Sequence, residues 1–151
     1  MVGPETGLET GGGFPAMTNS ALAMSYLTKA KSRLKLLPLL LADCNFSDVI
    51  RESQEIVELA LKGILRQMGI EPPKWHDVSE LLISHQERFP EPFQLRIPRL
   101  AEISKWLRKE RELAFYGDID FIPSEEYTEK DAKRAIADAV FVVQNAMSLI
   151  P

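Results

Sequence analysis

Apolar residues recur at steps of three and four along most of the chain, the spacing that places side chains on one face of an α-helix. The first series predicts a helix over about residues 19–43, which Pro38 is expected to kink because proline lacks a backbone N–H. Its apolar positions are Ala23, Tyr26, Leu27, Ala30, Leu34, Leu37 and Leu41. A second series predicts the next helix, with cap candidates at 45–48 and Gly69 at its end. That series comprises Val49, Ser53, Ile56, Val57, Ala60, Ile64 and Met68.

Prolines divide the middle of the chain. The paired prolines within residues 70–76 predict a stiff, extended linker. A short helix is expected over about 78–88, with Asp77 accepting hydrogen bonds from its first backbone N–H groups. Two further prolines break the chain within 89–92, and a longer helix is predicted from about residue 93 or 98 to 115.

The last helix has a clear start signal. Thr128 and Asp131 have the spacing of a capping box, with Asp in place of the usual Glu, and the apolar residues that follow predict a helix as far as Ile150. No alternating strand pattern competes with these helices. The predicted fold is therefore all-α, an up-and-down antiparallel bundle of four long helices plus one short helix.

Composition and charge narrow the class of protein. The chain has 151 residues, of which 45% are hydrophobic and 26% are charged, as is typical of one soluble domain. A formal net charge of −4 argues against nucleic-acid binding through overall charge and leaves that role to a local basic patch. Cys44 is the only cysteine, so the sequence predicts no disulfide, no Cys–His zinc site and a reducing, cytoplasmic location. We expect neither a metal nor another cofactor.

The N-terminal residues differ from the rest of the chain. Five of the eight glycines precede Met17, in a stretch with few large apolar side chains. Burial there cannot offset the entropy lost on ordering the backbone, so we expect a disordered tail over 1–18 and a helical domain over 19–151. The longest apolar run, 36–42, is too short to cross a bilayer, and we expect no secretory leader.

The helix predicted to end at residue 115 contains an arginine close to its apolar face. Arg111 falls about 40° from Leu107 on a helix, and arginine is almost never fully buried unless it is paired. Two interpretations stay open. Arg111 either forms a structural ion pair with Glu58 or Glu55, or it faces a cleft or a subunit interface.

A polar stripe lies beside the second apolar series and consists of Gln54, Glu58 and Lys62. Such a stripe is usually a solvated face supported by Glu–Lys pairs. The functional alternative is that Glu58 lines the same pocket as Arg111 and holds its guanidinium in place.

Other polar and aromatic residues have both a functional and an ordinary interpretation. The basic side chains within 29–35 could contact phosphate, but their spread around the helix is typical of a solvated face. Four aromatic residues could stack on bases, although aromatics in a bundle are more often core or dimer contacts. These four are Trp75, Trp106, Phe115 and Tyr116. His76 and His85 are the only histidines, and we expect His76 with Asp77 to cap a helix rather than bind a metal.

Taken in order, these segments resemble the HEPN domain family over about residues 21–150. The likeness rests on Tyr26-Leu27 with Ala30, on Phe46-Ser47-Asp48-Val49 leading to Gln54, Glu58 and Lys62, on the linker 74–78, on the run from Arg108 to Asp118, and on the closing helix from Asp131-Ala132. The resemblance implies an up-and-down bundle that forms a symmetric homodimer and is often encoded beside a minimal nucleotidyltransferase, as a toxin–antitoxin-like pair.

Many members of this family are metal-independent ribonucleases with a motif of an arginine, four to six residues and a histidine. In this chain Arg111 has the arginine position and Tyr116 stands where the histidine would be. The resemblance implies that the arginine stabilises the phosphorane while the histidine moves protons. Because free tyrosine has a pKa of about 10 and is a poor base near neutral pH, the substitution argues against ordinary ribonuclease activity.

Three functional hypotheses follow. The first is a HEPN dimer that binds a nucleotide, RNA or a nucleotidyltransferase partner through Arg108, Arg111, Glu58, Tyr116 and Asp118. The second is a metal-independent ribonuclease in which Arg111 stabilises charge while Tyr116 or His76 handles the proton, and the third is a structural scaffold in which Arg111 is a satisfied ion pair. Arg108 is either a second phosphate contact or the surface partner of Glu112, and Tyr116 is also a candidate site for nucleotidylation.

Overall fold

The computed structural model describes residues 18–74, 77–115 and 127–151, with the backbone alone described over 112–115. Within these ranges the chain forms helices and contains no strand, which confirms the all-α prediction. The helices are α1 (Asn19–Leu34), α2 (Leu37–Ala42), α3 (Phe46–Gln67), α4 (Val78–Ser84), α5 (Ile97–Phe115) and α7 (Glu129–Leu149). Two 3-10 turns lie at Gln86–Arg88 and Phe93–Arg96. Most of the predicted disordered tail, residues 1–17, lies outside the described part of the chain.

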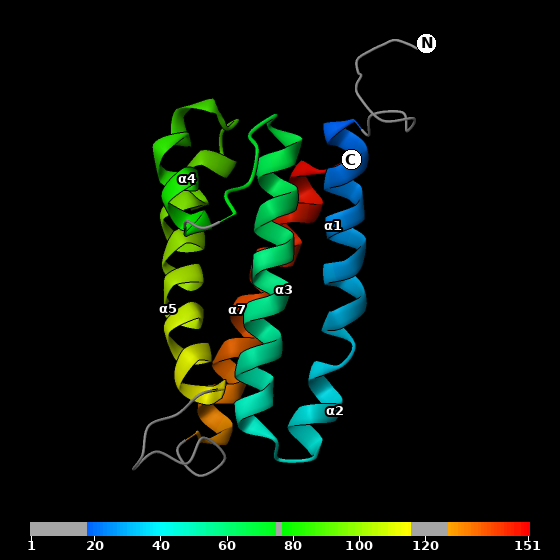
Figure 1. Ribbon diagram of the computed structural model, residues 1–151, viewed down its shortest axis with the longest axis vertical. Helices are drawn as coiled ribbons and strands as arrows, with labels where there is room; N and C mark the ends of the chain where they lie inside the picture. Colours follow the sequence, from blue (N-terminus) through cyan, green and yellow to red (C-terminus); the bar gives the residue numbers. More distant parts are fainter. Residues whose placement is uncertain (1–17, 75–76, 116–126) are drawn as a thin grey trace.

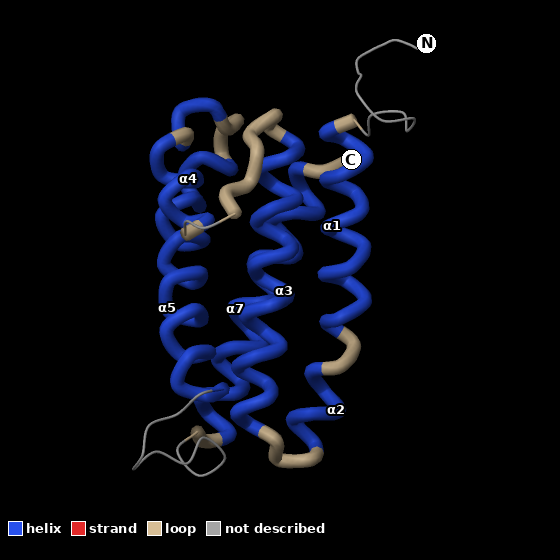
Figure 2. Tube along the Cα trace, viewed as in Figure 1, coloured by secondary structure: helices blue, strands red, loops and turns tan. Residues whose placement is uncertain are grey.

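The four long helices run along the long axis of the molecule, each antiparallel to the next one in the chain (Figure 1). Helix α3 lies among the others and packs against α1, α5 and α7. Helix α4 packs on the first part of α5, and loops join the helices at both ends of the bundle (Figure 2). This is the up-and-down bundle that the sequence predicts.

The position of α3 explains why it buries more residues than the other described helices. Every member of its predicted apolar series from Val49 to Ile64 is buried, and so are Ile50, Leu61 and Leu65, which fall outside that series. A helix that contacts three neighbours buries more than one face, so a single stripe of apolar positions underestimates its core contribution.

The first predicted helix, 19–43, is wrong as a single kinked element. Helix α1 ends at Leu34 and α2 begins at Leu37, with Pro38 in the first turn of α2. Between them the backbone N–H of Leu36 donates to the carbonyl of Arg33 at 3.0 Å, a bond typical of a tight turn. Proline in the first turn of a helix sacrifices no intrahelical hydrogen bond, so the chain starts a new helix there instead of bending the old one.

Two other predicted bounds also change. The short helix, predicted over 78–88, ends at Ser84 and is followed by the 3-10 turn Gln86–Arg88. The longer helix, predicted to start at residue 93 or 98, is preceded by the 3-10 turn Phe93–Arg96 and begins at Ile97. Pro98 therefore lies in the first turn of α5, the part of a helix that tolerates proline.

The predicted caps at Asp77 and Thr128 are confirmed. The carboxylate of Asp77 accepts from the Ser79 N–H at 3.0 Å, and Thr128 and Asp131 form a reciprocal capping box. Asn45 makes no side-chain cap bond, because its amide donates instead to the Asp48 carboxylate at 2.7 Å.

Among the described helices, none combines the length and the apolar character needed to cross a membrane.

Candidate functional site

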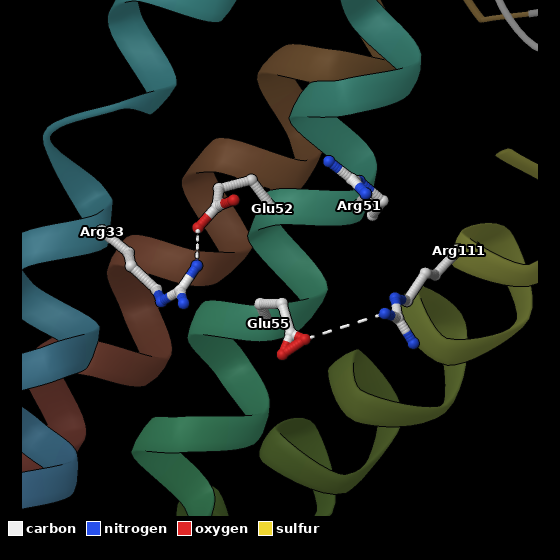
Figure 3. Close-up of a pocket in the computed structure, with 5 residues that line it drawn as sticks. All are labelled: Arg33, Arg51, Glu52, Glu55 and Arg111. Carbon is white, nitrogen blue, oxygen red and sulfur yellow. Dashed lines mark hydrogen bonds and ion pairs between the residues drawn. The ribbon is translucent and has the colours of Figure 1, made fainter. Parts of the chain in front are cut away.

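A polar pocket of about 260 Å³ lies where α1, α3 and α5 come together. Its lining consists of Arg33 from α1, of Arg51, Glu52 and Glu55 from α3, and of Arg111 from α5. Figure 3 shows these side chains converging over α3, with α7 passing behind that helix. Three guanidinium groups and two carboxylates line the pocket, and Arg51 also lies 3.8 Å from the carboxylate of Asp48.

Arg33 and Glu52 form the tighter ion pair of this pocket. Nη1 of Arg33 donates to Oε2 of Glu52 at 3.0 Å, which joins α1 to α3. Glu52 is the more buried partner, with 13% of its side chain exposed against 47% for Arg33. The carboxylate thus fixes one end of the guanidinium while about half of the Arg33 side chain faces solvent.

Arg111 is held more loosely. Its Nη2 atom lies 3.7 Å from Oε2 of Glu55, which is an ion pair but is longer than a hydrogen bond. The side chains of Arg111 and Glu55 are 41% and 40% exposed. Nε of Arg111 is buried and has no hydrogen-bond partner among the described residues. Arg111 therefore keeps donor capacity that the described residues do not use.

A second link between α3 and α5 lies one turn away from the pocket. Arg108 lies 3.7 Å from Glu58 and 4.0 Å from Asp77, and the Gln54 amide donates to Glu58 at 3.2 Å. Burial raises the pKa of Glu58 above its ordinary value, and the nearby Arg108 partly opposes that shift. Gln54 is only 6% exposed, so the interpretation of this stripe as a solvated face is wrong at that position.

Helix direction explains which carboxylate meets which arginine. Since α3 and α5 are antiparallel, moving three residues forward along α3 corresponds to moving three residues back along α5. Glu55 thus pairs with Arg111, and Glu58 pairs with Arg108. The described residues that line the Arg111 pocket do not include Glu58, and Arg108 lies near Glu58 and Asp77. The side chain of Glu112, the alternative partner of Arg108, lies outside the described part of the chain.

Several predicted site residues cannot be placed by this geometry. Tyr116, Asp118 and His76 lie outside the described residues. His85 follows α4, beside the 3-10 turns that precede α5. Arg111 lies 14 residues into α5, about 21 Å along the helix axis. An imidazole at His85 is therefore beyond hydrogen-bond reach of the Arg111 guanidinium.

Sequence reasoning missed part of the pocket lining. Arg51 and Glu52 were not candidates, and Arg33 was one of several basic side chains interpreted either as phosphate contacts or, more commonly, as a solvated face. The available signal was the step of three and four residues that places Arg51, Glu52 and Glu55 on one side of α3. Within the described ranges, no cluster of His, Cys, Asp and Glu side chains is suited to holding a metal ion.

The all-helical bundle agrees with a family comparison. A family model for the HEPN domain matches residues 23–148, which covers the bundle from α1 to α7. The chain therefore belongs to the HEPN domain family. Comparisons with the curated proteins and with the solved structures gave no match.

Proposed function

We propose that this HEPN-family protein binds the phosphate group of a nucleotide or of an RNA strand in the pocket lined by Arg33, Arg51 and Arg111. The observation that carries the proposal is the state of Arg111, whose Nε is buried without a hydrogen-bond partner among the described residues. A buried donor left unpaired costs about 1–3 kcal/mol. Rotation of the Arg111 side chain, which is 41% exposed, would bring that donor to a phosphate oxygen, and a planar guanidinium suits phosphate geometry.

The pocket supports binding more strongly than a purely structural role. A satisfied structural pair would have short hydrogen bonds and no adjoining cavity. Arg111 instead lies 3.7 Å from Glu55 and lines a cavity of about 260 Å³. The proposal is limited to binding, because the described residues that line the pocket include no histidine, and Tyr116 and His76 lie outside the described part of the chain.

The family resemblance adds expectations about assembly. A homodimer, a nucleotidyltransferase partner within a toxin–antitoxin-like pair and a cytoplasmic location belong to the proposal on that resemblance alone. Co-purification with a neighbouring nucleotidyltransferase tests the partner, and light scattering of the purified chain tests the dimer.

Titration calorimetry and fluorescence anisotropy test the pocket directly. Inorganic phosphate, adenosine monophosphate and a labelled single-stranded RNA serve as separate probes. A nucleotide site and an RNA site are then distinguished by which probe binds with the highest affinity. Arg111→Ala and Arg33→Ala are expected to weaken binding of the preferred probe about tenfold or more, because each removes a charge-assisted contact. Lys31→Ala removes an equal charge from an exposed position on α1 outside the pocket lining and should change affinity less than twofold.

Two results would overturn this function. One is equal affinity of the wild type and Arg111→Ala for every probe, and the other is the absence of binding to all three. The same RNA is also incubated with EDTA and analysed on gels. Cleavage that disappears in Arg111→Ala would establish a metal-independent ribonuclease instead of a binding module.

A further inference from the structure

A second group of arginines lies between α5 and α7, away from the pocket. We call it the arginine seam, and it consists of Arg96, Arg99 and Trp106 on the α5 side and Arg134, Asp138, Phe141 and Asn145 on α7. Each of its arginines has a polar partner on α7. The atoms involved differ entirely from those that line the Arg111 pocket.

One carboxylate fixes two of these guanidinium groups. Asp138, whose side chain is only 7% exposed, accepts a hydrogen bond from Nη2 of Arg99 at 3.2 Å and lies 3.8 Å from Nε of Arg134. Arg96 donates to the side-chain oxygen of Asn145 at 3.1 Å. From Arg134 to Asn145 the seam extends about 16 Å along α7.

Aromatic rings lie beside the same two arginines. The guanidinium carbon of Arg134 lies 3.9 Å from the centre of the Trp106 ring, and that of Arg99 lies 5.9 Å from the centre of Phe141. The Arg134 and Arg99 side chains are nevertheless 58% and 55% exposed. Their inner sides are therefore held against protein while much of each guanidinium is open to solvent.

These features fit an unpaired nucleotide. The flat face of a guanidinium stacks on a nucleobase, and its N–H edge binds phosphate. The three arginines outnumber the carboxylates of Asp138 and of Glu102, which lies 3.5 Å from Arg99, so an anionic strand is favoured. We propose that the arginine seam binds single-stranded RNA, with a base stacked on Arg134 above Trp106 and a phosphate on Arg99. The inference rests on the proposed function for its ligand class, but it does not depend on Arg111.

Anisotropy titrations of the full chain with labelled ten-residue oligouridylate and oligoadenylate test the seam. Arg134→Ala is expected to weaken binding about tenfold, since stacking of a single base on a side chain contributes on that scale. Arg134→Lys keeps the charge but loses the planar face, so several-fold weakening should persist. Lys133→Ala is the matched control, because Lys133 is the adjacent residue, is equally charged and pairs with Glu129 at 2.7 Å outside the seam. It should change affinity less than twofold.

Tryptophan emission gives a readout that a structural role would not move. The chain has two tryptophans, so Trp75→Phe leaves Trp106 as the only one. Addition of oligoadenylate should quench Trp106 emission in this variant, and Arg134→Ala in the same background should remove most of the response. Thermal melting of each variant identifies any substitution that fails to fold, and Arg99→Ala then serves as the second test of the seam.

Three results would overturn the inference. In the first, Arg134→Ala and Arg99→Ala bind both oligonucleotides as tightly as Lys133→Ala does. In the second, neither oligonucleotide changes Trp106 emission, and in the third, Arg134→Ala halves the molar mass measured by light scattering, which would make the seam an interface between copies. Arg111→Ala separates the two proposals, since loss of RNA binding in that variant alone supports the pocket and refutes the seam, and loss in Arg134→Ala alone does the reverse.

Discussion

Arg111 and Glu55 face each other at 3.7 Å, an ion pair that is too long for a hydrogen bond. Glu55 therefore neutralises Arg111 without occupying its donors, and it competes with any anion that enters the pocket. We predict that Glu55→Gln raises the affinity for phosphate probes several-fold. The free energy of unfolding should change by less than about 0.5 kcal/mol, because exposed pairs contribute little to stability.

Calorimetry and urea unfolding measure these two effects. Glu80→Gln, at an exposed position on α4, is the control for the change in net charge. Weaker phosphate binding by Glu55→Gln would contradict the prediction and would mean that Glu55 orients Arg111 instead of competing with the ligand.

Glu58 gives the protein a pH-dependent stability. Burial raises the pKa of Glu58 above its ordinary value of 4.5. At a pH between the unfolded and the folded pKa, Glu58 is protonated in the folded state and ionised in the unfolded state. The contribution of this proton to the free energy of unfolding is therefore complete below about pH 4.5 and is lost as pH rises through the folded pKa. The difference in unfolding free energy between the wild type and Glu58→Gln should therefore fall over that range and then level off.

Urea unfolding of both proteins at intervals from pH 4 to 8 checks this. The comparison with Glu58→Gln is needed because burial also raises the pKa of Asp138 and adds a trend of the same sign. A difference that grows with pH would show that Arg108 outweighs desolvation at Glu58.

The capping box at the start of α7 should make a measurable contribution to stability. Thr128 accepts from the Asp131 N–H at 3.2 Å, and the Asp131 carboxylate accepts from the Thr128 N–H at 3.0 Å. Thr128→Ala is expected to lower the free energy of unfolding by about 1 kcal/mol. Thr128→Ser keeps the hydroxyl and should lie much closer to the wild type in urea unfolding. Equal losses in the two variants would mean that the methyl group, not the cap, is responsible.

Substitution of Leu107 tests whether this residue belongs to the hydrophobic core beneath the site. It is fully buried on α5, so Leu107→Ala should cost about 2–5 kcal/mol through lost burial and the cavity left behind. The same substitution at Leu95, which is 76% exposed, should change stability by less than about 0.5 kcal/mol in urea unfolding. Similar losses at the two positions would contradict the assignment of Leu107 to the core.

The helices could be predicted because each one repeats a local pattern. Thr128 with Asp131, and Asp77 ahead of α4, are signals contained within a few residues, and the structure reproduces both. The division of residues 19–43 could not be predicted, because the apolar period continues across it. The turn bonds from Lys35 to Ser32 and from Leu36 to Arg33 show that the helix ends before Pro38.

The site was harder to predict because it depends on how helices are aligned. Sequence spacing identifies Arg111 as an arginine close to an apolar face, but it leaves Glu55 and Glu58 as equal partners. The relative shift of α3 and α5 selects Glu55. Arg33 and Arg51 join the pocket from separate helices, and no local pattern links them to Arg111.

The placement of α3 among the other long helices has a consequence for synthesis of the chain. Helix α3 is complete at Gln67, whereas α7, which covers part of it, ends at Leu149. A ribosome thus releases the helix with the most buried residues long before its final neighbour. Until then the nascent protein presents an exposed hydrophobic surface of the kind that chaperones bind and that leads to aggregation. Translation that stops short of α7 therefore leaves a fragment with that surface permanently open.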